Sequence, residues 1–131
     1  MGRTANKQTQ PQTMETMEAV EIAARAAGEK KATEIVALDL REVASFTEYF
    51  VICTGANTRQ VQAISNSVEE QLRSAGKRPL HIEGYSTGEW ILLDYGDFIM
   101  HVFSNSSRRF YDLERLWRDA APVKLPEELR A

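Results

Sequence analysis

Cysteine is nearly absent from this chain, since Cys53 is the only one among 131 residues. A disulfide within the chain is therefore impossible, which fits a reducing compartment. Long apolar runs are also missing, because none approaches the roughly 20 residues that span a bilayer. The first residues lack the apolar core of a secretory signal. We expect a cytoplasmic protein that has no membrane among its partners.

An excess of basic residues is missing as well. The sequence holds 16 lysines and arginines against 19 aspartates and glutamates, a net charge of −3. Neutralising phosphates requires a basic surface, so this composition argues against a general nucleic-acid binder and against a DNA partner. If the protein acts on a ribonucleoprotein particle, we expect it to touch a basic protein there rather than the RNA. The hydrophobic fraction of 43% is enough for a core without disulfides or metals.

What is present divides into a tail, a domain and a second tail. Residues 1–13 are polar and lack periodicity, so they are predicted to be disordered. Residues 14–120 carry apolar side chains at helical and strand spacing and form the predicted domain. Residues 121–131 contain Pro122 and Pro126 and are predicted to be a loose tail.

The domain is predicted to contain elements in the order α-β-β-α-β-β-β-α. Helices are expected at 14–29, at 58–75 and from Ser106 or Ser107 onward, and strands at 33–40, 49–54, 80–83, 90–94 and 98–104. Strand 49–54 is continuously apolar, which indicates a central strand covered on both faces. The strand-helix-strand passage implies a parallel pair, and the turn at Gly96 implies a hairpin. The predicted fold class is α/β, a mixed five-stranded sheet with flanking helices.

Two features of the helices are expected from spacing. Asn57 should cap the second helix, with Gln60 completing a capping box three residues later. The last helix should bury four residues at core spacing: Phe110, Leu113, Leu116 and Trp117. Its arginines, which are Arg108, Arg109, Arg115 and Arg118, alternate with acidic residues and are interpreted as a solvated mixed-charge face.

Paired acids and histidines could indicate a metal site. Asp94 and Asp97 flank a turn and could hold magnesium for phosphoryl or nucleotidyl transfer. Aspartate is also favoured around glycine turns, and the Gly-Ser loop with an Asp-x-Asp pair that a nucleotidyltransferase needs is missing. His81, Glu83 and His101 lack the short-spaced ligand pair typical of a metal centre. We therefore predict no metal and no cofactor.

A nucleophile and a phosphate loop are the other two possibilities. Cys53 lies inside an apolar strand, which favours a buried small side chain over a reactive thiol. The passage from Thr54 to Gln60 leads from a strand into a helix, a geometry that can bind phosphate. It lacks a Walker lysine and a Gly-x-Gly-x-x-Gly pattern, so an ordinary helix cap is favoured. We predict no catalytic residue.

Acidic and aromatic residues gather between residues 83 and 97. The cluster consists of Glu83, Tyr85, Glu89, Trp90, Leu92, Asp94, Tyr95 and Asp97. Trp90, Leu92 and Asp94 alternate onto one face of a strand. Tryptophan and tyrosine dominate interface energetics, and surrounding carboxylates would select a basic partner. The same pattern fits equally well with Trp90 and Leu92 packed as core beneath a helix.

Four segments resemble the Iojap family of ribosomal silencing factors. They read TEYFVICTGANTRQVQAI, HIEG, GEWILLDYGDFIMHVF and RRFYDLERLW, and they occur in the family's order. The resemblance covers roughly residues 17–120. The tail before Met14 is an extension that the family does not require. Cys53 is a small residue that the pattern tolerates, and Gly28 interrupts a segment that is usually plain helix.

The resemblance implies a nucleotidyltransferase-like shape without the catalytic residues, and therefore no enzymatic activity. It further implies binding to the large ribosomal subunit through ribosomal protein L-fourteen. The bound factor would block joining of the small subunit and repress translation, and the free protein would be a homodimer. A large-subunit assembly factor and a nucleotide-binding enzyme of similar shape are the alternatives.

The docking surface is predicted from placement within and beside the acidic-aromatic cluster. The expected apolar anchors are Trp90, Leu92, Tyr95 and Met100, and the carboxylates expected to face basic residues of the partner are Glu83, Asp94 and Asp97.

Overall fold

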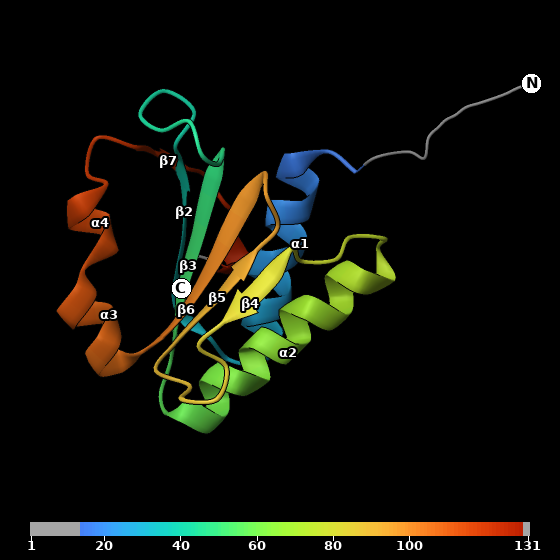
Figure 1. Cartoon of the computed structure of the whole chain (residues 1–131), viewed down its shortest axis with the longest axis vertical. Coiled ribbons are helices and arrows are strands. Elements are labelled where there is room, and N and C mark those ends of the chain that lie inside the picture. Colours follow the sequence, from blue (N-terminus) through green and yellow to red (C-terminus); the bar gives the residue numbers. More distant parts are fainter. Residues whose placement is uncertain (1–13, 130–131) are drawn as a thin grey trace, which may run out of the picture.

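The computed structural model describes residues 14–129, so the predicted N-terminal tail lies outside the described residues. In chain order the elements are α1 (Thr16–Glu29), β2 (Thr33–Asp39), β3 (Tyr49–Gly55), α2 (Thr58–Ser74), β4 (His81–Glu83), β5 (Trp90–Asp94), β6 (Phe98–Ser104), α3 (Asn105–Tyr111), α4 (Leu113–Leu116), β7 (Ala121–Val123) and the 3-10 turn η1 (Glu127–Leu129). The strands form one sheet in the order β4-β5-β6-β3-β2-β7 (Figure 1). The predicted mixed α/β class with flanking helices is confirmed.

The centre of the sheet is a parallel pair, as the sequence predicted. β3 and β6 run parallel, with Ile52 opposite His101. β5 and β6 form the predicted antiparallel hairpin, with Trp90 opposite Phe103. Every residue of both central strands is buried, because helices pack on both faces of the sheet and leave no face for water.

The sheet has six strands within the described residues, so the prediction of five was wrong. The sixth strand, β7, comes from residues predicted to be a loose tail and pairs antiparallel with β2. Pro122 is tolerated there because β7 is an edge strand, where a missing N–H costs little. Beyond it, Leu125 and Leu129 are buried in the same core as α1. These apolar side chains hold the C-terminal segment against the core, although its two prolines had suggested a loose tail.

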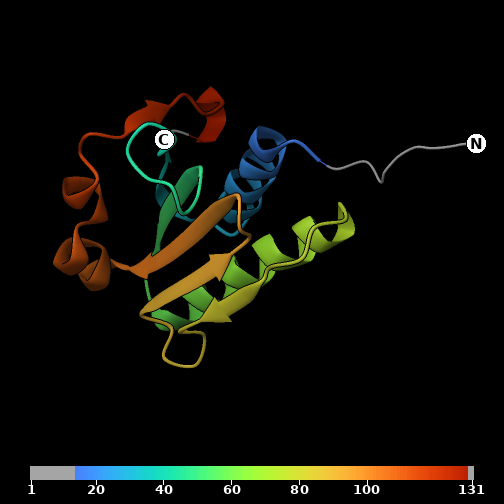
Figure 2. The same cartoon turned by 45° about the horizontal axis from the view of Figure 1, so that its top comes forward.

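The two faces of the sheet carry different helices (Figures 1 and 2). α1 and α2 cover one face, which we call the α1–α2 face, and bury Val51, Phe98 and Met100 there. α3 and α4 lie on the opposite face, the α3–α4 face, above Phe50 and Ile52. Alternate residues of each strand enter these two separate apolar clusters, as the pleat requires.

The start of α2 has the predicted Asn57 cap, but the Gln60 side chain accepts from the N–H of Ala56 rather than from that of Asn57, so the capping box is formed only in part. The Asn57 side chain accepts a hydrogen bond from the Gln60 backbone N–H at 2.8 Å. The Gln60 side chain accepts one from the Ala56 backbone N–H at 2.6 Å. α1 begins at Thr16 rather than at Met14, and Gly28 lies inside the helix rather than after its end. The residue with a left-handed conformation after α1 is Lys31, whose φ is +67°.

The predicted last helix is broken in two. Asp112 adopts a left-handed conformation with φ +49° and separates α3 from α4. Ser104, not Ser106 or Ser107, caps α3. The break changes the direction of the chain, so the spacing of the apolar residues no longer defines one buried stripe. Phe110 and Leu116, predicted as core, are 79% and 71% exposed.

Candidate functional site

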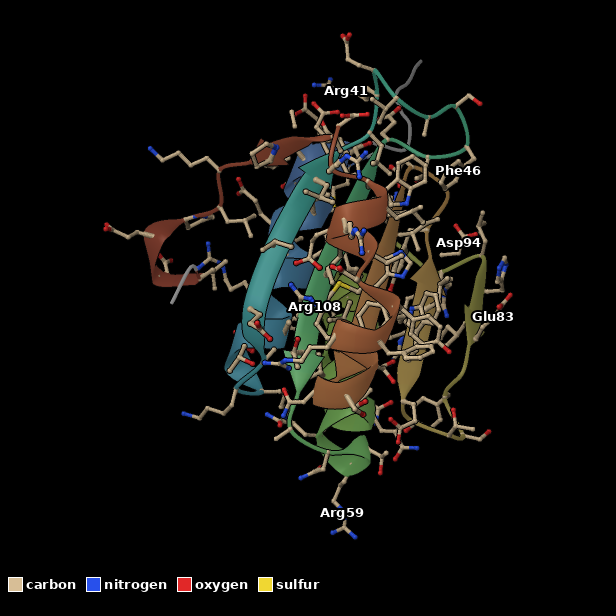
Figure 3. All side chains as sticks on the ribbon, turned by 90° about the vertical axis from the view of Figure 1, so that its left-hand side faces the viewer. Arg41, Phe46, Arg59, Glu83, Asp94 and Arg108 are labelled. Carbon is tan, nitrogen blue, oxygen red and sulfur yellow. The ribbon has the colours of Figure 1, made fainter. Side chains whose placement is uncertain are left out.

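The α3–α4 face is left open at β4 and β5. α3 and α4 lie over the middle of the sheet, and Glu83 and Asp94 lie to one side of them (Figure 3). On β5 the half-buried Trp90 and Leu92 pack with the apolar cluster of the α3–α4 face. The intervening residues Ile91 and Leu93 are fully buried on the opposite face. The predicted alternation of Trp90, Leu92 and Asp94 onto one face is therefore present.

β4 extends this open face with a second carboxylate. Glu83 pairs with Leu92, and His81 pairs with Asp94. The His81 Nε2 atom lies 3.4 Å from a Glu83 carboxylate oxygen and 3.6 Å from an Asp94 oxygen. Glu83, Trp90 and Leu92 also line a hollow of about 200 Å³. We call Glu83, Trp90, Leu92 and Asp94 the β4–β5 surface.

Trp90 is held in place by neighbours on β6 and α3 rather than projecting freely. Its indole N–H donates a hydrogen bond to Nδ1 of His101 at 3.1 Å. Its ring lies 5.0 Å from the Phe103 ring and 4.6 Å from the Tyr111 ring, between centroids. These contacts reconcile the two sequence interpretations, because Trp90 is partly core and partly available to a partner. A pre-ordered aromatic side chain loses little entropy on binding.

His101 supports Trp90 in its neutral form. The ring is only 3% exposed, and this burial lowers its pKa to about 3. Since Nδ1 accepts the Trp90 hydrogen bond, the proton of the neutral ring must reside on Nε2. That atom is buried and has no hydrogen-bond partner among residues 14–129. Sequence reasoning missed this role because the hydrogen bond joins residues that are not direct partners in the strand register.

Three of the seven predicted docking residues lie elsewhere. Met100 is 0% exposed and Tyr95 is 5% exposed, and both belong to the core of the α1–α2 face. Tyr95 stacks on Phe98 with the ring centroids 4.9 Å apart. Asp97 accepts hydrogen bonds from Thr16 at 2.8 Å and from Lys77 at 3.1 Å. Strand alternation places Met100 on the wrong face, so Tyr95 and Met100 cannot serve as exposed anchors.

An aromatic row continues the β4–β5 surface across the α3–α4 face. From Trp90 it runs through His101 to Phe50, whose ring centroid is 4.5 Å from the imidazole. Phe50 and the exposed Phe46 each lie 5.8 Å from Trp117. Sequence reasoning did not connect these residues, because they come from a loop, three strands and the end of α4.

The other candidate sites resolve into structural roles. Asp94 accepts a hydrogen bond from the Gly96 backbone N–H at 2.8 Å, which is the turn interaction expected for an aspartate beside glycine. Among residues 14–129, no three His, Cys, Asp or Glu side chains come together as a metal site.

Cys53 is fully buried, and burial raises the pKa of its thiol to about 12. The N-terminus of α2 is occupied by the Asn57 and Gln60 side chains. Within the described range, no helix is both long and apolar enough to span a bilayer.

Solved structures share this fold. A crystal structure of a protein from Chromobacterium violaceum superposes with a TM-score of 0.78 at 37% sequence identity, covering 80% of this chain and 88% of that one. A second structure, from Bacillus halodurans, gives a TM-score of 0.75 at 34% identity and covers 84% of this chain and all of that one.

Several sequence relatives have names that refer to the ribosome. The chain is 40% identical over 101 residues to ribosomal silencing factor RsfS of Bacillus subtilis, covering 77% of this chain and 86% of the relative. It is 35% identical over 108 residues to the chloroplastic protein Iojap of Zea mays, covering 79% of this chain and 45% of the relative. A mouse relative, mitochondrial assembly of ribosomal large subunit protein 1, is 27% identical over 92 residues, covering 68% of this chain and 40% of the relative. The family described as "Ribosomal silencing factor during starvation" matches residues 13–131, and the chain belongs to this family.

Proposed function

We propose that this protein binds the large ribosomal subunit through ribosomal protein L-fourteen, blocks joining of the small subunit, and so represses translation. The observation that carries the proposal is the β4–β5 surface, where an ordered tryptophan lies beside two carboxylates on an open sheet face. Membership in the silencing-factor family supplies the ribosomal context. In place of the seven residues predicted from sequence, we assign docking to Glu83, Trp90, Leu92 and Asp94.

The chemistry of this surface suits a basic protein partner. Trp90 and Leu92 offer apolar area whose burial stabilises a complex by roughly 25 cal/mol per Å². Glu83 and Asp94 flank them, and carboxylates at the rim speed encounter with a positively charged partner and reject a negatively charged one. Ribosomal proteins face RNA and are commonly basic, so an acidic rim selects the protein component of the subunit.

The proposed mechanism is steric and requires no catalytic residue. A folded domain seated on the surface where the two subunits meet leaves no room for the small subunit. The extent of repression then follows occupancy, which depends on the dissociation constant and on the concentration of the factor. We propose the cytoplasm as its location and a homodimer as its free state; sedimentation of the free protein over a range of concentrations tests the latter.

Sedimentation with separated ribosomal subunits tests the proposal. We expect the protein to co-migrate with the large subunit and not with the small one. Adding it to a mixture of both subunits should reduce the amount of joined ribosomes. Co-migration with neither subunit at low salt would refute ribosome binding, and co-migration without any loss of joined ribosomes would refute the steric block.

A second candidate function is assembly of the large subunit. The observation that favours it is the name of the mouse relative, which refers to assembly of the mitochondrial large subunit. The same β4–β5 surface would serve both functions at different stages. Preferential association with immature rather than mature large subunits in cell extracts would support assembly over silencing.

A nucleotide-binding function is the remaining alternative. It would follow from the nucleotidyltransferase-like shape that the family resemblance implies. Thermal unfolding with ATP or GTP and magnesium tests it, because a ligand at 100 times its dissociation constant adds about 2.7 kcal/mol of stability. We expect no shift in the midpoint of unfolding, and a clear shift would favour this alternative.

A further inference from the structure

The outer surface of α3 and α4 contains a second hollow. It has a volume of about 570 Å³ and is open to solvent. Its lining residues are Arg109, Phe110, Tyr111, Asp112, Arg115, Leu116, Arg118 and Asp119. The break at Asp112 creates this concavity, because it separates two short helices that would otherwise form one convex rod.

Three arginines of the hollow are exposed to a ligand, although Nη1 of one of them, Arg109, also donates a hydrogen bond to the Asn105 carbonyl at 3.2 Å. Arg109, Arg115 and Arg118 are exposed, and none of them takes part in an ion pair within residues 14–129. The fourth arginine of the segment, Arg108, is instead buried and paired with Glu114 at 2.7 Å. With two aspartates also present, the hollow keeps a net positive charge, whereas the chain as a whole carries −3.

Apolar groups lie among these arginines and join the hollow to the β4–β5 surface. Phe110 and Leu116 are the two most exposed apolar side chains of α3 and α4. The Phe110 ring packs edge-on against Tyr111 at 5.0 Å, and Tyr111 lies 4.6 Å from Trp90. One aromatic line therefore runs from the acidic docking surface into the arginine hollow.

We propose that this hollow, here called the α3–α4 hollow, binds an unpaired segment of ribosomal RNA next to the protein that the β4–β5 surface recognises. The inference rests on the proposed function for its ribosomal context. A ribosome presents protein and RNA side by side, and this molecule presents an acidic-aromatic surface and a basic-aromatic hollow side by side.

The residue types favour unpaired RNA over an acidic protein. Guanidinium groups bind phosphate oxygens through paired hydrogen bonds. An exposed phenylalanine offers a flat surface on which an unstacked base can stack, and sequence-tolerant recognition of single strands combines these two contacts. An acidic peptide would engage the arginines but has no flat group for Phe110. The three arginines occupy one small hollow, so a short RNA segment suffices.

Two variants test the proposal, together with a matched control. Arg115→Ala combined with Arg118→Ala removes two charges from the hollow, and Phe110→Ala removes the stacking surface. The control combines Arg59→Ala with Arg78→Ala, which removes the same charge from exposed positions at the start of α2 and after its end. Arg59 lies at one end of the molecule, away from α3 and α4 (Figure 3). Thermal unfolding confirms that each variant is folded.

The first measurement is binding of a labelled single-stranded RNA oligonucleotide at low salt, with an RNA duplex and a poly-glutamate peptide as competitors. We expect the single strand to bind the full-length protein and the control, and to lose about five-fold or more in affinity in Phe110→Ala. Equal loss in the control, no binding of RNA, or tighter binding of poly-glutamate would overturn the inference, whatever the protein does on ribosomes.

The second measurement is binding to purified large subunits over a range of salt concentrations. The double arginine variant should bind more weakly, and the slope of log affinity against log salt should fall by about 2, one for each phosphate that the variant no longer neutralises. If the full-length protein binds large subunits and this variant binds them equally well with an unchanged slope, the inference is wrong while the proposed function stands. If the full-length protein does not bind large subunits at all, the proposed function is wrong, and the oligonucleotide measurement still decides whether the hollow binds RNA.

Discussion

The Trp90 indole N–H donates to Nδ1 of His101 at 3.1 Å, so the half-buried Trp90 side chain on β5 is ordered by a buried side chain two positions along β6 from its direct cross-strand partner. The hydrogen bond fixes both the orientation of the tryptophan and the tautomer of the histidine. Surface and core are therefore coupled at this point, and substitutions there should change both binding and stability.

Trp90→Ala should weaken binding to the large subunit by about 2 kcal/mol or more, the cost typical of a buried aromatic anchor. Because Trp90 is half-buried against Phe103 and Tyr111, we also expect a loss of roughly 2 kcal/mol in unfolding free energy, less than for a fully buried ring. Sedimentation and urea unfolding measure the two effects. Leu80→Ala, which removes an exposed apolar side chain outside the β4–β5 surface, should change neither; full binding by folded Trp90→Ala protein would refute the assignment.

His101 should make the unfolding free energy fall in mild acid. Its folded pKa of about 3 lies below the ordinary value of 6.5, so the unfolded chain binds a proton first as the pH falls. The stability contributed by the neutral ring is complete above about pH 6.5 and is lost progressively between pH 6.5 and 3. At pH 5 the loss is about 2 kcal/mol relative to neutral pH.

His101→Gln provides the comparison, because glutamine does not titrate and its amide oxygen can accept the Trp90 hydrogen bond. Urea unfolding between pH 7 and pH 4.5 should show a shallower decline for this variant than for the original protein. All other groups are the same in the two proteins and cancel in the difference. Parallel pH profiles would show that His101 is not the responsible group.

Arg108→Met should destabilise the fold by roughly 2 kcal/mol. The buried guanidinium donates to the Thr54 hydroxyl at 2.8 Å and to the Glu114 carboxylate at 2.7 Å, joining α3, β3 and α4. The cost stays below that of a fully buried ion pair, because Glu114 reaches solvent once its partner is gone. Arg109→Met is the matched control, since the neighbouring Arg109 is exposed. Equal stability of the two variants in urea would contradict the role of Arg108 as a tether.

Leu125→Ala should cost about 3 kcal/mol of unfolding free energy, the middle of the range for a buried leucine. Leu125 follows β7 and is buried in the core of the α1–α2 face. Leu116→Ala serves as the control, because Leu116 is largely exposed and its loss should cost under about 0.5 kcal/mol. A small effect of Leu125→Ala would mean that the C-terminal segment adds little to the fold, as its prolines alone would suggest.

Prediction from sequence succeeded where a feature depends on residues close together in the chain and no distant contact opposes it. The Asn57 cap of α2 formed as predicted, because a cap depends on residues three positions apart. The hairpin at Gly96 also formed, since that residue has φ +88° and no side chain to oppose it. Prediction failed for Phe110 and Leu116, because helical spacing is meaningful only if the helix continues, and Asp112 ends it.

The candidate site was predicted in part for the same reason. Alternation along β5 placed Trp90, Leu92 and Asp94 together, and the structure keeps them together. The same alternation, applied to β6, would have placed Met100 on the other face, because it pairs with Leu93. Tyr95 follows the end of β5 in a turn, where alternation gives no guidance.

The sequence by itself determined the fold class, the central parallel pair and the family, because apolar periodicity and ordered motifs are properties of the chain. Only the tertiary structure decided which aromatic side chains are exposed, that residues 121–123 complete the sheet, and that three exposed arginines line one hollow together with Phe110. Those outcomes depend on contacts between residues far apart in the chain. An edge strand is stabilised by the strand it pairs with, and two short helices are stabilised by the sheet on which they pack. No local sequence pattern specifies those neighbours.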